Sequence, residues 1–284
     1  MRSKTLLENQ RKRQHQIMFG YSIYNDENPF GWDGNIDSIV YRKFYASEKD
    51  ENGILWEELC CSEMEFNTQG NVSQITEYRK DELFSRCLRE YDDEGNLIIE
   101  KSYNAQGENG TEIKYKYNRW GDLIEKVILH AQEPSIKYLY TYDRQGKLIQ
   151  TLEHNISGKY KYWTTYLYNE DGNIVMRAEM FPNGLLGEID TYSYDKNGNN
   201  ESKILRESFE SFICYEYDNE GKVIKSIEKS HSLESESTDK CDNEISQAWY
   251  EEFEYDAKGN VISSIEREGS EIFYRHEWII KYRK

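Results

Sequence analysis

The chain has 284 residues, of which 53 are acidic and 36 basic, and its formal net charge at pH 7 is −17. This excess of negative charge would repel the phosphates of a nucleic acid, so we expect no nucleic-acid partner and favour a basic protein partner. No stretch of about 18 apolar residues is present, which argues against a membrane-spanning helix and a membrane partner.

Residues 1–20 are predicted to form an N-terminal arm or a short helix. Residues 1–16 are basic and polar and lack the apolar core of a signal peptide. The five cysteines are scattered without paired spacing, which is typical of reduced thiols. Both observations favour a cytoplasmic location.

Residues 21–65 contain irregular turn sequences, at Asp33-Gly34-Asn35 and Glu51-Asn52-Gly53. The terminal units of a repeat array are atypical because they must seal the stack. We therefore interpret residues 21–65 as degenerate N-terminal capping repeats, and residues 66–284 as the repeat array itself.

A recurring pattern, Tyr-(Asp/Asn)-x-x-Gly followed by a polar and an apolar residue, dominates the array. Clear copies begin at Tyr91, Tyr117, Tyr142, Tyr168, Tyr194, Tyr217 and Tyr255, the one at Tyr194 ending in Asn200 instead of an apolar residue, and a weaker copy begins at Phe66. The turn glycines are Gly70, Gly95, Gly121, Gly146, Gly172, Gly198, Gly221 and Gly259. A period of about 25 residues indicates a repeat architecture rather than one globular domain with a single pocket.

Each copy predicts a hairpin turn. The Asp or Asn after the tyrosine suits the first position of a type I turn, because its side chain can accept a hydrogen bond from the backbone two residues on. The glycine supplies the left-handed conformation that a following bulge requires. A type I turn with such a glycine is a common β-hairpin connection.

The arms before the turns follow the order aromatic, variable, tyrosine, as in Tyr115-Lys116-Tyr117. Residues two apart share one face of a strand, so both rings lie on one face and the residue between them points to the other. The first rings form a predicted column of candidate binding residues: Tyr115, Tyr140, Tyr166, Tyr192 and Tyr215.

Less regular turns are predicted between the repeats. They are Asn104-Ala105-Gln106-Gly107, Asn155-Ile156-Ser157-Gly158, Pro182-Asn183-Gly184 and Glu268-Gly269. The predicted fold is all-β, a long twisted antiparallel meander of β-hairpins with about sixteen strands. An acidic loop at 229–247 lengthens one repeat, and loops often carry function. The C-terminal strand, residues 272–282, is expected to cover the last edge.

The pattern resembles the YD repeats of RHS-type proteins, over roughly residues 66–262. The chain has neither the RHS core segment nor a toxin domain, so it resembles a short standalone form of the family. The resemblance implies a fold unit and a binding habit, and it carries over no catalytic residue.

No catalytic, cofactor or metal site is predicted. The five histidines, His15, His130, His154, His231 and His276, show no metal-ligand spacing among themselves or with the cysteines. Glycine-rich phosphate loops are absent from the sequence. Acidic residues are so frequent that no carboxylate pair stands out.

Two functions remain open from the sequence. The first is a non-catalytic protein-binding scaffold, whose sharpest form is a cytoplasmic immunity protein that neutralises a basic bacterial toxin. The alternative is a carbohydrate-binding YD-repeat module, which requires the column of tyrosines to be exposed. A homodimer through an edge strand is a further expectation for an open sheet.

Overall fold

The computed structural model describes residues 35–50, 53–155, 157–194, 200–206, 209–218, 223–232 and 249–283. These residues form eighteen β-strands in one sheet. The predicted arm at 1–20, residues 21–34 of the predicted cap, most of the 229–247 loop, and two of the turn glycines, Gly198 and Gly221, lie outside the described residues.

The first nine strands are β1 (Ile36–Asp50), β2 (Gly53–Phe66), β3 (Val72–Arg79), β4 (Glu82–Tyr91), β5 (Leu97–Asn104), β6 (Asn109–Tyr117), β7 (Leu123–His130), β8 (Glu133–Tyr142) and β9 (Leu148–Asn155). The remaining nine are β10 (Tyr160–Tyr168), β11 (Ile174–Met180), β12 (Leu186–Tyr194), β13 (Asn200–Arg206), β14 (Phe209–Tyr217), β15 (Val223–Ser232), β16 (Trp249–Tyr255), β17 (Val261–Glu268) and β18 (Glu271–Tyr282). The predicted all-β meander of hairpins is confirmed. No helix in the described part of the chain has the length and apolar character needed to cross a membrane.

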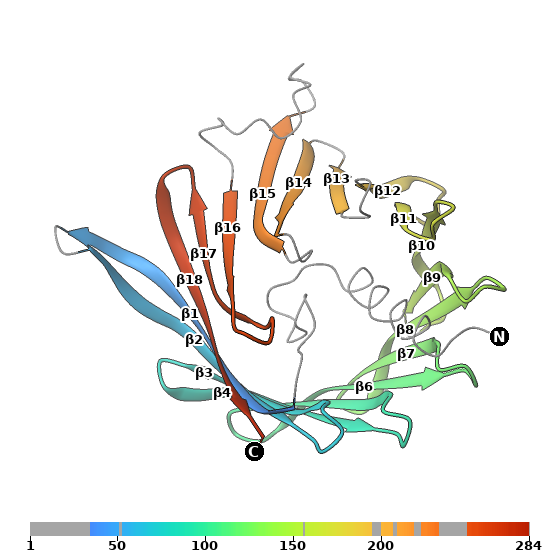
Figure 1. The fold of residues 1–284 in the computed structure, drawn as a ribbon. Helices are drawn as coiled ribbons and strands as arrows, with labels where there is room; N and C mark the ends of the chain where they lie inside the picture. The colour runs from blue at the N-terminus through green and yellow to red at the C-terminus, as the bar shows by residue number, and fades with distance from the viewer. Residues whose placement is uncertain are drawn as a thin grey trace.

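Each strand pairs antiparallel with its neighbour in sequence, and β1 pairs with β18 as well as with β2. The pairings therefore run in a circle, with blue β1 beside red β18 in Figure 1. Both strands that would be the edges of an open sheet are paired on both sides. A homodimer through an edge strand was expected, but none of the eighteen described strands has an unpaired edge that could make this contact.

The strand count differs from the prediction of about sixteen because the region interpreted as a cap contributes two long strands. β1 has 15 residues and β2 has 14. Their turn lacks the Tyr-Asp-x-x-Gly pattern, so the repeat did not reveal them. The prediction that the C-terminal strand covers the last edge is correct, and the strand it meets there is β1.

The repeat turns have the predicted geometry. In the β4–β5 turn the backbone N–H of Gly95 donates to the carbonyl oxygen of Asp92 at 3.0 Å, and the N–H of Asn96 donates to the Asp92 carboxylate at 2.7 Å. Gly95 has φ of 83°, in the left-handed region that favours glycine. Positive φ is also found at Gly70, Gly121, Gly146, Gly172 and Gly259, and at the inter-repeat glycines Gly107, Gly158, Gly184 and Gly269.

Two connections use short turns without glycine, at Lys80-Asp81 and Ala131-Gln132. All four residues have positive φ, with 49° at Ala131 and 69° at Gln132. An L-residue with a Cβ atom in this region costs about 1–2 kcal/mol. The sequence did not reveal these turns because neither pair belongs to the residue types that usually occupy them.

The repeat tyrosines join one hairpin to the next. The hydroxyl of Tyr117 donates to the carbonyl oxygen of Leu97 at 2.9 Å, and that of Tyr168 donates to Leu148 at 2.7 Å. In each case the acceptor is the first residue of the strand that follows the preceding repeat turn. The same bond is made by Tyr91, Tyr142, Tyr194 and Tyr255. A phenylalanine at the recurring position could not make this bond, because it lacks the hydroxyl that donates to the carbonyl oxygen.

Candidate functional site

The predicted tyrosine column lies on the buried face of the sheet. Tyr166 keeps 7% of its surface exposed and packs with Leu148 and Ile174, and Tyr140 and Tyr192 flank the same cluster. Burial raises the pKa of Tyr140 and Tyr192 far above the ordinary value. Tyr115 and Tyr215 are half-buried. The condition set for sugar stacking, exposed rings, is therefore not met at Tyr166.

The residues between the paired rings point to the opposite face, as predicted. All six are exposed in the described arms: Lys116, Thr141, Leu167, Ser193, Glu216 and Glu254. The two faces of the sheet therefore differ in composition. One face carries the recurring tyrosines, and on the other face the residue type changes from repeat to repeat.

Charged groups are also buried on the tyrosine face, and most of them are paired. Arg177 lies 2.8 Å from the Asp190 carboxylate and 3.3 Å from that of Glu188, and also contacts Glu179. Burial lowers the pKa of Arg177, but the bond and charge of Asp190 outweigh it and shift it upward. Glu153, with 1% of its surface exposed, lies 3.1 Å from the Lys161 ammonium.

The densest polar group is the His276 cluster, defined by Tyr41, Lys43, Glu251, Ser264, Glu266 and His276. Strand register brings its members together: His276 lies opposite Lys43 on β1 and Ser264 on β17, and Glu266 lies opposite Glu251 on β16. Directly opposed residues share a face of the sheet. Four strands thus contribute to one cluster: β1 from the beginning of the described chain and the consecutive strands β16, β17 and β18.

Within the cluster both imidazole nitrogens of His276 are engaged. Nδ1 lies 2.7 Å from the Tyr41 hydroxyl and Nε2 lies 2.6 Å from Oε1 of Glu266. The Lys43 ammonium lies 3.8 Å from the same carboxylate oxygen. His276 and Ser264 are fully buried. The hydroxyl of Ser264 donates to Oε1 of Glu251 at 2.8 Å.

The two carboxyl groups of the cluster differ in acidity. Burial raises the pKa of Glu251 to about 7, despite the hydrogen bond from Ser264. Burial also acts on Glu266, but its bonds and charge contacts with His276 and Lys43 lower the pKa of this carboxyl overall. Glu251 can therefore exchange a proton near neutral pH, whereas Glu266 stays ionised.

Sequence patterns do not predict this cluster, because its three potential metal ligands lie on three strands with no local spacing in common. The ligand atoms of Glu251, Glu266 and His276 lie within 4.8 Å of one another. Only the register of β16, β17 and β18 brings these residues together, and the periodicity of the sequence does not define that register.

The exposed turn tips form a second candidate site. We call tip residues the two residues between the Asx and the glycine of each repeat turn. They are exposed in every described copy: Thr68-Gln69, Asp93-Glu94, Arg119-Trp120, Arg144-Gln145, Glu170-Asp171 and Ala257-Lys258. Because alternate turns of an antiparallel meander lie at the same end, all six are at one end of the sheet. Trp120 is 62% exposed, with the Arg119 guanidinium 4.2 Å from its ring centroid.

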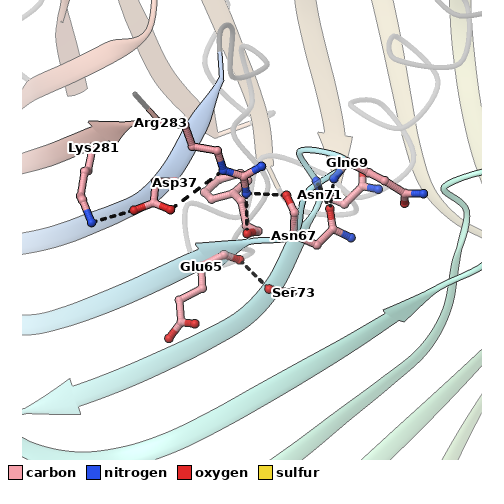
Figure 2. Close-up of polar contacts among 9 residues, drawn as sticks. Asp37, Glu65, Asn67, Gln69, Asn71, Ser73, Lys281 and Arg283 are labelled. Atoms are coloured by element: carbon pink, nitrogen blue, oxygen red, sulfur yellow. Dashed lines mark hydrogen bonds and ion pairs between the residues drawn. The ribbon is translucent and has the colours of Figure 1, made fainter.

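At the same end, the circle of strands is held by a closure junction, defined by Asp37, Phe66, Asn67, Lys281 and Arg283. Figure 2 shows Arg283 reaching from the end of β18 to the β2–β3 turn. Its guanidinium donates to the carbonyl oxygens of Phe66 at 2.7 Å and Asn67 at 2.5 Å. Lys281 lies 2.7 Å from the Asp37 carboxylate. This junction is structural in character.

Comparison with protein families gives one match. A family model described as "Uncharacterised protein" matches residues 62–186, less than half of the chain. No curated protein matches.

Several solved structures resemble the fold at low identity. A porin-like protein from Bacteroides uniformis ATCC 8492 is 13% identical with a TM-score of 0.46, over 87% of this chain and 98% of that chain. The Tc holotoxin pore of Photorhabdus luminescens is 14% identical with a TM-score of 0.35, over 89% of this chain and 14% of that chain. A complex titled TcdB2-TccC3-Cdc42 is 11% identical with a TM-score of 0.29, over 77% of this chain and 15% of that chain. This chain therefore spans only a small part of the Tc toxin chains.

Proposed function

We propose that this chain is a non-catalytic scaffold that binds a basic protein through the tip residues of its repeat turns. The proposal rests on the different roles of the residues within each turn. The tyrosine, the Asx residue and the glycine build the hairpin, whereas the two tip residues are exposed and differ from copy to copy. A constant framework with variable loops is the arrangement in which binding residues are commonly placed.

The net charge of the chain and two of the six tips support a basic partner, whereas three other tips carry the cations Arg119, Arg144 and Lys258. Asp93-Glu94 and Glu170-Asp171 place two exposed carboxylates side by side at the same end of the sheet. Trp120 adds an exposed aromatic ring, the type of residue that dominates binding energy at interfaces. Acidic groups speed the capture of a basic protein and make its binding dependent on salt.

We propose a non-catalytic role because the charged groups described above are bonded to one another within the sheet. The His276 cluster and the Arg177 group are paired within the sheet. A hollow of about 500 Å³ lies instead beside β4, β5 and β6, lined by Phe84, Ser85, Ser102, Tyr103, Asn104, Ala105, Gln106 and Gly110. None of these residues is an Asp, Glu, Lys, Arg or His.

A narrower form of the proposal is a cytoplasmic immunity protein of YD-repeat, RHS-like type that neutralises a basic bacterial toxin. Its support is the acidic charge and the repeat pattern. The carbohydrate alternative has less support, because Tyr166 is buried and its neighbours in the column pack around it.

A pulldown from a lysate of the source organism, in low and high salt, tests the proposal with a matched pair of variants. Asp93→Lys with Glu94→Lys reverses two charges at the tip end. Glu82→Lys with Glu133→Lys reverses two exposed charges at the opposite end, so the net charge changes equally. We expect a stoichiometric basic protein to be retained by the wild type and by the Glu82/Glu133 variant, and lost with the Asp93/Glu94 variant. Equal losses in both variants, or no stoichiometric partner, would contradict the proposal.

A further inference from the structure

Three side chains of the His276 cluster offer metal-ligating atoms that converge on one point. They are a carboxylate oxygen of Glu251, a carboxylate oxygen of Glu266 and Nε2 of His276, all within 4.8 Å of one another. Two ligands of one tetrahedral zinc ion lie about 3.3–3.6 Å apart, since each bond is about 2.0–2.2 Å long. Small side-chain rotations would bring all three into range. We propose that Glu251, Glu266 and His276 bind one divalent transition-metal ion.

The ligand types define the class of ion. One imidazole nitrogen and two carboxylate oxygens suit zinc and its first-row neighbours, such as cobalt, in a site completed by water. Calcium and magnesium prefer sites made of oxygen ligands alone. The site should therefore discriminate against both of these ions, which separates it from an ordinary acidic surface.

Outer hydrogen bonds already orient two of the ligands. The Tyr41 hydroxyl contacts Nδ1 of His276, the nitrogen that does not face the carboxylates. The Ser264 hydroxyl contacts Oε1 of Glu251. Metal sites commonly have such supporting bonds, which fix the tautomer of the histidine and the rotamer of the carboxylate.

Metal binding requires His276 to change tautomer. In the metal-free cluster the 2.6 Å contact between Nε2 of His276 and Glu266 needs a proton on Nε2. A metal ion takes the lone pair of Nε2, so the one proton of the neutral ring moves to Nδ1, and Nδ1–H then donates to the Tyr41 oxygen. Metal affinity should rise with pH, because carboxylate and imidazole ligands bind a metal ion only through deprotonated atoms.

Lys43 is the competitor for this site. Its ammonium lies 3.8 Å from Glu266 and is largely buried, so it supplies positive charge to the carboxylates when no metal is present. Removing that charge while keeping the length of the side chain should favour the metal ion. A Lys43→Met variant is thus expected to bind the ion more tightly than the wild type, an effect opposite to that of ligand removal.

The test is titration calorimetry of the full-length, chelator-treated protein with zinc, together with the visible absorbance of its cobalt complex. We expect one zinc ion per wild-type chain, at least about tenfold weaker binding by Glu251→Gln, and tighter binding by Lys43→Met. His130→Gln removes an exposed histidine outside the cluster and should change nothing. The cobalt absorbance should appear with the wild type and fade with Glu251→Gln.

Several results would overturn the inference. These are no saturable zinc binding by either the wild type or Lys43→Met, equal binding by Glu251→Gln and the wild type, or calcium binding as tight as zinc binding. Circular dichroism establishes that each variant is folded. If Glu251→Gln does not fold, the comparison of Lys43→Met with the wild type decides, because tighter zinc binding is expected only if Lys43 competes with a metal ion.

Discussion

The hydroxyl of Tyr142 donates a hydrogen bond of 2.7 Å to the backbone carbonyl oxygen of Leu123, in the hairpin before its own. Replacing Tyr142 by phenylalanine should lower the free energy of unfolding by about 1 kcal/mol, because this hydrogen bond is lost while the ring remains. Urea denaturation measures the change. Tyr103→Phe is the control, since no hydrogen bond to the Tyr103 hydroxyl is found among the described residues. Equal effects would show that the inter-hairpin bond contributes nothing.

The turn at Ala131-Gln132 stores backbone strain that sequence changes can relieve. Replacing the pair by Asn-Gly should raise the free energy of unfolding by about 1–2 kcal/mol, because these residues tolerate positive φ and favour this hairpin turn. Gly70→Ala introduces such strain at φ of 85°, where no atom obstructs a Cβ, and should lower the free energy of unfolding by about 1 kcal/mol. Thermal and urea unfolding measure the stability of both variants. If neither variant differs from the wild type, positive φ at these turns carries no strain.

The raised pKa of Glu251 predicts a pH dependence of stability. Its folded pKa of about 7 lies above the ordinary value of 4.5, so the folded state holds a proton that the unfolded state releases. The resulting loss of stability begins near pH 4.5, grows up to about pH 7 and is then constant.

Glu251→Gln should therefore unfold like the wild type below pH 4.5 and be more stable at pH 8, by roughly 3 kcal/mol at most. The measurement is urea denaturation across this pH range with a chelator present. Glu254→Gln, an exposed change on the same strand, is the control and should not show this trend. A wild type that is more stable than Glu251→Gln at pH 8 would contradict the burial of this carboxyl.

Arg283 and Lys281 should differ in their importance to the closure junction. Arg283→Gln removes charged hydrogen bonds to two carbonyl oxygens and should cost about 1.5–3 kcal/mol. Lys281→Gln removes only an exposed ion pair with Asp37 and should cost less than about 1 kcal/mol. Hydrogen exchange should accelerate at β1, β18 and the β2–β3 turn in Arg283→Gln alone. Similar exchange in both variants would rule out the special role of Arg283.

The sequence predicted most of the fold, because its turns depend on local chemistry. Asp92 and Gly95 define one hairpin within a few residues, and the pattern repeats. Closure was not predicted, because the pairing of β1 with β18 depends on the twist summed over all strands. The His276 cluster was missed for a related reason: Glu251, Glu266 and His276 meet only through strand register. The tyrosine column was placed on one face correctly, but periodicity does not say whether that face is covered.

The pairing of β1 with β18 has a consequence for synthesis of the chain. The backbone N–H of Arg283 donates to the carbonyl oxygen of Asn35 at 2.8 Å, so the earliest and latest described residues are neighbours. Until β18 emerges from the ribosome, β1 has one unpaired edge and the newest strand has another, and unpaired edges promote aggregation. Bringing together strands so distant in sequence also makes this pairing slow. The nascent protein should therefore depend most on chaperones in the interval before β18 is made.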